Sequence, residues 1–361
     1  MTRRALAGPA LAAGLAVSLT ATAPAQQRPT PPPPGPAVIH PDEKHFRSLR
    51  QLTVGGENAE GYWSPDGKSI IYQRKNEAEG VACDQAFVVD VASGASRRVS
   101  NGKGRVTCGY FTEGGRRVLY ASTHLADTAC PPPADYSKGY VWPMYAGYDI
   151  VSHALDGSGE KRLTETPGYD AEATLSPDGK TIVFTSVRDG DLEIYTMAPD
   201  GSKVKRLTHE PGYDGGPFFS PDGKRIVYRR DVHGDDASLA GYRELLAKSL
   251  YRPRVLELWV MDRDGGNKRQ VTRLGAASFA PYFHPDGRRI IFSSNHPDPR
   301  GRAFDLYLIG DDGRGLERVT SDPTFDGFPM FSPDGKQLVF ASNRGGKTAG
   351  ETNLFLVDWV E

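Results

Sequence analysis

The sequence carries almost no net charge and, after its first 25 residues, no long apolar run. Its 361 residues include 44 lysines and arginines against 45 aspartates and glutamates, a formal net charge of −1. Such a balance gives no electrostatic footprint for a polyanion, so we expect no nucleic-acid partner. A bilayer-spanning helix needs about 20 apolar residues. No later segment approaches that length, so we expect no transmembrane segment in the mature chain.

Motifs of several common enzyme classes are also missing. The sequence contains no G-x-S-x-G nucleophile elbow, which leaves acyl transfer of the α/β-hydrolase kind without support. The Gly-Lys-Ser/Thr triplets at 67–69, 179–181 and 346–348 lack the upstream glycine that a phosphate loop requires. His209-Glu210 is not followed by the second histidine of a zinc helix. We therefore assign no catalytic residue.

Residues 1–25 have the features of a secretory signal. A two-arginine start precedes a small-residue apolar stretch that ends near Leu19, and Ala-Pro-Ala at 23–25 provides a cleavage site. Residues 26–44 follow as a proline-rich linker built around RPTPPPPGP, which cannot join a packed core. We expect a periplasmic or secreted protein.

Glycine and proline, by contrast, are abundant, with 41 and 28 residues, and many of them fall in repeats. Six segments end in Ser-Pro-Asp-Gly or a close variant, at 62–67, 110–115, 174–179, 218–223, 282–287 and 330–335. This sequence suits a type I turn, and an alternating strand follows each time. A later strand in most repeats ends in KRLT or a variant of it. Four short antiparallel strands repeated six times predict an all-β fold, a six-bladed β-propeller over residues 45–361.

The repeats also predict how the ring closes. The last one, NLFLVDWVE at 353–361, has no fourth strand after it. The missing motif stands at the other end of the propeller, as Arg50-Gln51-Leu52-Thr53. We expect this N-terminal strand to join the C-terminal blade, which removes two exposed edges.

The repeat FSPDGK…IVFTS…LEIYTMAPDG…KRLT resembles that of the TolB-like β-propeller family. The resemblance covers roughly residues 46–361 and is specific for fold rather than for function. It extends to the propeller halves of prolyl-oligopeptidase-type peptidases. Neither the α/β domain that precedes the propeller in TolB nor the hydrolase domain of the peptidases is recognisable, so we expect a stand-alone propeller. The resemblance implies envelope lipoproteins or membrane-associated proteins as partners.

The spacing between successive turns locates two insertions. It is 48, 64, 44, 64 and 48 residues, so the second and fourth repeats each exceed the third by 20. Both insertions fall between second and third strands, and therefore on the same loop face of the propeller. Long insertions on one face of a rigid scaffold are where recognition tends to reside.

The two insertions differ in composition. The first, residues 122–148, carries five aromatic residues: Tyr136, Tyr140, Trp142, Tyr145 and Tyr148. These suit stacking on a glycan or anchoring a peptide, or they pack the loop onto its own blade. The second, roughly residues 231–255, has apolar residues at helical spacing and predicts a short amphipathic helix, which either covers the ring or binds a partner.

Acidic residues recur on the first strands, which line the central channel of a propeller. Aligned on the turn, they are Asp170, Asp214 and Asp326, with Glu60 and Glu172 two positions further along their strands. One interpretation is that they converge at the channel mouth and hold a divalent cation or the amino group of a peptide. The other is that each aspartate caps its own turn. Apart from such a cation we expect no cofactor.

Three cysteines, Cys83, Cys108 and Cys130, fall near the loop face of the first two blades. In an oxidising compartment one disulfide is expected. We predict Cys108–Cys130, which would fix the long insertion to its own blade. Cys83–Cys108 is the alternative pairing, and a metal site completed by His124 is a third interpretation.

These features favour one function and leave a second open. The favoured hypothesis is a monomeric, non-catalytic, exported propeller whose loop face binds an envelope or secreted protein, or a glycan. The alternative is a metal-assisted propeller enzyme that acts on polysaccharide or peptide at the channel mouth, suggested by the acidic and aromatic residues.

Overall fold

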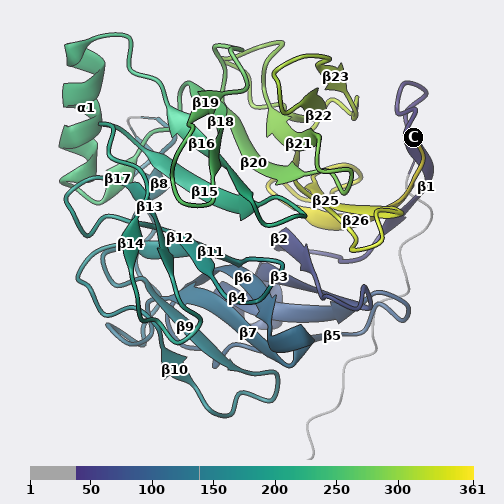
Figure 1. The fold of residues 1–361 in the computed structure, drawn as a ribbon. Coiled ribbons are helices and arrows are strands. Elements are labelled where there is room, and N and C mark those ends of the chain that lie inside the picture. The colour runs from purple at the N-terminus through teal and green to yellow at the C-terminus, as the bar shows by residue number, and fades with distance from the viewer. Residues whose placement is uncertain (1–37, 138) are drawn as a thin grey trace, which may run out of the picture. The chain divides into compact units, whose positions relative to one another are not determined.

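A computed structural model describes residues 38–137 and 139–361 and arranges them as six four-stranded antiparallel blades in a ring (Figure 1). The all-β, six-bladed propeller predicted from the repeats is confirmed. The predicted signal at 1–25 and the first part of the predicted linker lie outside the described residues. No helix among the described residues is long and apolar enough to cross a membrane.

The first strand of each blade contacts the first strands of its neighbours, so these strands surround the channel. Blade 1 consists of β2 (Glu57–Trp63), β3 (Ser69–Asn76), β4 (Val81–Asp90) and β5 (Ser96–Arg98). Blade 2 consists of β6 (Val106–Thr112), β7 (Arg117–Ser122), β9 (Asp149–Ala154) and β10 (Lys161–Arg162). Blade 3 consists of β11 (Asp170–Leu175), β12 (Ile182–Ser186), β13 (Glu193–Met197) and β14 (Lys205–Arg206). Blade 4 consists of β15 (Asp214–Phe219), β16 (Arg225–Asp231), β18 (Leu256–Asp262) and β19 (Arg269–Gln270). Blade 5 consists of β20 (Ser278–Phe283), β21 (Arg289–Ser294), β22 (Asp305–Gly310) and β23 (Glu317–Arg318). Blade 6 consists of β24 (Asp326–Phe331), β25 (Gln337–Ser342), β26 (Asn353–Trp359) and β1 (Phe46–Gln51).

Among the described residues, five short elements lie outside the blades. They are the helix α1 (Asp236–Leu246), the 3-10 turns η1 (Glu77–Glu79) and η2 (Glu113–Gly115), and a two-stranded sheet of β8 (Trp142–Pro143) and β17 (Leu250–Tyr251). The strands β8 and β17 belong to the two long insertions.

The Ser-Pro-Asp-Gly turns are held by their own side chains. The Ser176 hydroxyl donates to Asp178 at 2.6 Å and accepts the N–H of Thr181 at 3.0 Å, which joins the turn to the start of β12. The same pair of bonds recurs in the turns that begin at Ser64, Ser220 and Ser332.

The KRLT motif also has a repeated structural role. In every blade a hydroxyl two residues beyond the fourth strand accepts an N–H of the third strand at 2.8–3.1 Å. The acceptors are Thr53, Ser100, Thr164, Thr208, Thr272 and Thr320. Because a buried backbone donor left unpaired is costly, this hydroxyl explains why the motif ends in threonine or serine.

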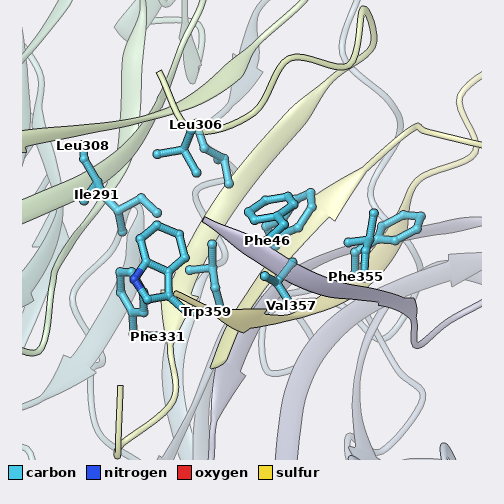
Figure 2. Packing of buried hydrophobic residues seen from close by; sticks show 12 residues of the cluster. Phe46, Ile291, Leu306, Leu308, Phe331, Phe355, Val357 and Trp359 are labelled. Carbon is cyan, nitrogen blue, oxygen red and sulfur yellow. The ribbon is translucent and has the colours of Figure 1, made fainter. Parts of the chain in front are cut away.

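The predicted ring closure is confirmed. β1 pairs antiparallel with β26, with Arg50 opposite Leu356. Figure 2 shows Phe46 of β1 beside Phe355 and Val357 of β26, in a buried cluster that also takes side chains from blade 5. The N-terminal strand therefore completes the core of the last blade as well as its sheet.

Each first strand bulges at the same position, four residues before the turn serine. The pairing register shifts there in all six blades, and the residue adopts a positive φ between 49° and 58°. These six residues, here called the bulge ring, are Glu60, Cys108, Glu172, Gly216, Ala280 and Phe328. A left-handed backbone is unfavourable for non-glycine residues, so its repetition marks a constraint built into the innermost strands.

Candidate functional site

The two insertions meet on one face of the ring, as their positions in the sequence predicted. The strands β8 and β17 pair antiparallel, with Trp142 opposite Tyr251, and the Met144 N–H donates to the Ser249 carbonyl at 2.8 Å. We call residues 123–148 and 232–255, joined in this way, the lid. Because two separate repeats contribute to it, the lid connects blades 2 and 4.

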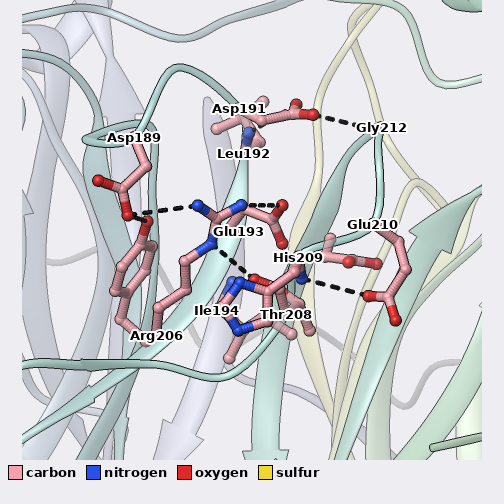
Figure 3. A network of polar contacts seen from close by, with 12 residues as sticks. Asp189, Asp191, Leu192, Glu193, Ile194, Arg206, Thr208, His209, Glu210 and Gly212 are labelled. Atoms are coloured by element: carbon pink, nitrogen blue, oxygen red, sulfur yellow. Dashed lines mark hydrogen bonds and ion pairs between the residues drawn. The ribbon is translucent and has the colours of Figure 1, made fainter.

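The helix in the second insertion covers the ring, one of the two roles expected for it. Its side chain Tyr242 is buried and its hydroxyl donates to Asp191. Figure 3 shows the polar network around Asp191, which also accepts the N–H of Gly212 at 3.1 Å. The helix therefore packs against blade 3 and holds the lid there.

Trp142 of the lid contacts residues of blades 4 and 5. Its ring contacts Tyr213, Tyr251 and Phe279, with centroids 5.5–6.4 Å apart, and it lies 5.0 Å from the guanidinium carbon of Arg229. Cation–π contacts of this kind are favourable when the cation is desolvated. The lid is thus seated on blades 4 and 5.

Arg229 itself is 7% exposed and is paired with Glu172 of the bulge ring. The Glu172 carboxylate also accepts from the Thr185 hydroxyl at 2.7 Å, the Tyr213 hydroxyl at 3.0 Å and the Gly216 N–H at 2.8 Å. These donors engage both of its oxygens. Glu172 is therefore committed to holding Arg229 and the lid in place.

Two glycines make room for this cluster. A Cβ on Gly216 would lie 2.8 Å from Nη1 of Arg229, and one on Gly215 would lie 2.4 Å from the Tyr213 hydroxyl. Gly216 also has a φ of 58° as the blade 4 member of the bulge ring. A side chain at either position would collide with the buried arginine or tyrosine.

Glu60, the other acid of the bulge ring, has a different environment. It is half-buried, and its Oε2 accepts the N–H of Cys108 at 3.2 Å. Burial raises the pKa of the Glu60 carboxyl to about 7, opposed by its hydrogen bond with Cys108 and aided by the charge of Glu172. Burial also keeps the pKa of the Cys108 thiol well above its usual range, so the thiol is neutral.

Aromatic rings meet across the channel two residues further along the first strands than Glu60. Tyr62 of blade 1 and Phe218 of blade 4 have centroids 5.7 Å apart, although these blades are opposite each other in a six-bladed ring. Tyr110 and Tyr282 flank them at 6.0 and 5.5 Å. Side chains from opposite sides thus meet across the axis at this level.

The three aspartates of the predicted channel set are paired within their own blades. Asp170 lies 3.1 Å from Arg188 and Asp326 lies 2.8 Å from Arg344. The corresponding distance from Asp214 to Arg230 is 3.8 Å. These arginines stand at or just beyond the ends of second strands, an arrangement that neither sequence interpretation anticipated. Among the described residues no group of three or more His, Cys, Asp or Glu side chains could hold a metal ion.

Arg344 also binds the N-terminal segment. It donates to Glu43 at 2.9 Å, and both side chains are buried. Glu43 precedes β1, so this ion pair supports the ring closure from the loop face.

The five aromatic residues of the first insertion divide into two groups. Tyr136 and Tyr140 are 51% and 62% exposed and lie nearly parallel, with ring centroids 6.2 Å apart. Trp142 donates its indole N–H to the Tyr140 hydroxyl at 3.1 Å, and Tyr145 donates to the Pro132 carbonyl at 2.7 Å. Tyr148 is buried. Tyr136 and Tyr140 thus face solvent, whereas the other three aromatic residues pack within the lid.

The predicted disulfide is wrong. Cys83 is bonded to Cys130, with Cα atoms 5.8 Å apart, and Cys108 is free. The physical reason is the bulge, which places Cys108 in the channel-lining ring, where its N–H bonds to Glu60. Cys83, on β4, fixes the insertion of the second repeat to blade 1 instead. The alternative Cys83–Cys108 pairing is wrong for the same reason.

His124 takes part in an arrangement that superficially resembles a catalytic triad. Its Nδ1 lies 2.8 Å from the Ser122 hydroxyl and its Nε2 lies 3.2 Å from Glu160. Ser122, however, is fully buried and cannot meet a substrate. Arg188 and Arg344 make the same contact with the serine two residues earlier, so His124 holds a repeated structural position.

The sequence interpretation missed Arg229. Nine residues after the turn serine, the other five repeats have Gln73, Ala121, Thr185, Ser293 and Ala341. A lone arginine in this set, opposite the Gly-Gly pair at 215–216, was the available signal. The partners Glu172 and Trp142 were both named from the sequence, but nothing there linked them.

Comparison with known proteins places the fold. A family model described as the TolB β-propeller domain matches residues 147–250 and 242–349. A Tol-Pal system protein TolB of Bordetella pertussis is 33% identical over 133 residues, which are 37% of this chain and 25% of that protein. The chain thus spans about a quarter of the length of the curated relatives it matches.

Two solved structures show the same architecture. TolB from Acinetobacter baumannii superposes with a TM-score of 0.54 at 20% identity, over 80% of this chain and 63% of that one. An oligogalacturonate lyase in complex with manganese superposes with a TM-score of 0.52 at 18% identity, over 86% and 80%. At these identities the likeness establishes the fold alone.

Proposed function

The chain belongs to the TolB β-propeller domain family, and we propose that it is an exported, monomeric, non-catalytic scaffold that binds a cell-envelope protein through its loop face. The observation that carries this proposal is the lid, in which two insertions from separate repeats are joined over one face of the ring. The lid presents the exposed pair Tyr136 and Tyr140.

The exposed pair has the properties of a protein-binding anchor. Tyrosine contributes a large contact area at low conformational cost, and exposed aromatic residues are enriched at interfaces. The disulfide Cys83–Cys130 and the β8–β17 pairing fix the segment before any partner arrives. Prior ordering lowers the entropy lost on binding.

Export is supported by the sequence and by the disulfide. Disulfides persist in oxidising compartments and are rare in the cytosol. The signal-like residues 1–25 agree with this. The name of the Bordetella relative, a Tol-Pal system protein, makes an envelope protein the partner class of choice for this proposal.

The alternative, a metal-assisted enzyme, draws less support from the same residues. Asp170, Asp214 and Asp326 face arginines, and Glu172 is engaged by several donors. The likeness to a lyase is one of fold. Glu60 differs from these acids in having no arginine paired with it among the described residues.

Cross-linking in intact cells, followed by mass spectrometry, tests the proposal. The wild-type chain should capture a specific envelope protein, and the double variant Tyr136→Ala/Tyr140→Ala should capture about tenfold less, as expected for loss of an aromatic anchor. Val204→Ala, which removes another exposed apolar side chain, is the matched control. Failure to capture a protein, together with tight binding of a glycan, would overturn the proposal.

A further inference from the structure

Glu60 is the acid of the bulge ring that is free to accept a ligand. Among the described residues its polar partner is Cys108, through the backbone N–H at 3.2 Å and the neighbouring thiol. Glu172, by contrast, has both oxygens engaged by Arg229, Thr185 and Gly216. Each carboxylate oxygen has two lone pairs, so a carboxylate whose partners all belong to one residue can still accept a hydrogen bond from an incoming donor.

The charges around Glu60 do not balance. Arg229 supplies one positive charge and is paired with Glu172, so an ionised Glu60 leaves one negative charge uncompensated. The nearby Cys108 thiol and Tyr62 hydroxyl are neutral, because burial keeps the pKa of each well above its usual range. A single added cation would restore neutrality, and such pairing offsets the cost of a buried charge.

The route to Glu60 limits the shape of that cation. Tyr62 and Phe218 meet across the axis, so a polypeptide cannot thread through the ring at this level. A ligand that enters from the loop face would therefore have to present a chain end or a long side chain to the carboxylate. Phe328, half-buried, occupies the equivalent bulge position on the adjoining blade 6, so an apolar residue rather than a second acid follows Glu60 in that direction around the ring.

The donor set also distinguishes among cations. A guanidinium group is recognised best by both oxygens of a carboxylate, and here Cys108 already uses one. A divalent metal ion needs several oxygen ligands, and no group of three or more candidate side chains is close enough among the described residues. A primary ammonium is a compact point charge on a narrow stem and fits a single accepting oxygen.

From these contacts we propose that Glu60 binds a primary ammonium group, a lysine side chain or an amino terminus, which the partner inserts into the channel from the loop face. That the ammonium group belongs to a protein partner rests on the proposed function, whereas the binding of an ammonium group by Glu60 does not. Glu60 then acts as a specificity-determining residue, because a partner with an amine at the matching position binds more tightly than one without it.

An NMR titration of the full chain labelled at glutamate carboxyl carbons tests this inference directly. The Glu60 resonance should titrate near neutral pH, apart from the exposed glutamates, and should be missing from Glu60→Gln. n-Butylammonium chloride at about 50 mM should lower its midpoint by about half a unit or more, because an adjacent cation favours the ionised form. 1-Butanol, the neutral analogue, should leave it unchanged.

An unchanged midpoint with n-butylammonium, or an equal shift with sodium chloride at the same ionic strength, overturns the inference. The midpoint shift is measured on wild-type protein, so the test remains valid even if Glu60→Gln does not fold. It needs no partner. If cross-linking captures no protein but the midpoint falls, the site stands and the proposed function fails; the converse result removes the site alone.

Discussion

The guanidinium carbon of Arg229 lies 5.0 Å from the centre of the Trp142 ring, and this contact joins the lid to blade 4. The same guanidinium is paired with Glu172 on blade 3. One buried side chain therefore neutralises an acid of the channel wall and supports the insertion from another repeat. The loop face is held in shape by the same residues that occupy the channel.

Replacing Arg229 should destabilise the propeller strongly. In Arg229→Met the Glu172 carboxylate loses its counter-charge in a buried site, and the free energy of unfolding should fall by about 3–5 kcal/mol. Urea denaturation measures the change. Glu172→Gln/Arg229→Met, which removes both charges, should recover part of the loss.

The matched control for this experiment is Arg243→Ala, since Arg243 lies on the exposed side of α1. It should change stability by less than about 0.5 kcal/mol. A similarly small effect of Arg229→Met would show that the arginine does not hold the lid.

Glu60→Gln should stabilise the protein at alkaline pH. The folded-state pKa of about 7 lies above the ordinary 4.5, so the folded state binds the extra proton and the wild type loses stability as pH rises between these values. The glutamine variant avoids that loss. The free energy of unfolding of Glu60→Gln should equal that of the wild type below pH 4.5. Above pH 7 it should exceed the wild-type value by about 2 kcal/mol, a figure that allows for the partial exposure of Glu60.

Urea denaturation of both proteins across this pH range gives the difference directly. Glu165→Gln, the same change at an exposed glutamate, is the control for the substitution itself. An advantage of Glu60→Gln that grows toward acidic pH would have the opposite sign and would refute the assignment.

Breaking the disulfide should loosen one segment and leave the blades intact. Cys130→Ser should lower the free energy of unfolding by about 2–4 kcal/mol, because the bond closes a loop between residues 47 positions apart. Hydrogen exchange over residues 125–137 should become faster, since few backbone hydrogen bonds hold this segment. Cys108→Ala keeps the disulfide, so exchange in the segment should stay at the wild-type rate.

Removing the closing contact should weaken the whole ring. Phe46→Ala takes a buried ring from the cluster shared by blades 5 and 6, and a cost of about 3–5 kcal/mol is expected. Arg47→Ala, on the same strand but exposed, is the control. Equal effects of the two changes in thermal denaturation would mean that β1 does not close the ring through this core.

The repeats determine the fold because each one encodes a local rule. Thr208 and its five counterparts each accept a third-strand N–H, so one motif read six times predicts six blades. The position of an insertion within its repeat also predicts its face; the pairing of β8 with β17 shows that the two insertions share one, although the pairing itself was not predicted.

Side-chain partners were harder to predict, because the bulges reorient residues in ways that spacing does not show. Glu60 and Glu172 hold the same position in their repeats, yet one is committed and the other is available. The difference comes from Arg229, on a non-adjacent segment. The bulge also explains why Cys108 was wrongly assigned to the disulfide, because its bulge conformation has no sequence signature.

The most direct test of the account is site-specific photo-cross-linking in intact cells. A benzophenone side chain at position 140, on the exposed aromatic pair, is compared with one at position 180, directly after the Ser-Pro-Asp-Gly turn at 176–179 on the opposite face. The account predicts that position 140 captures a specific envelope protein and position 180 does not. Capture of the same proteins from both positions, or from position 180 alone, would contradict binding through the loop face.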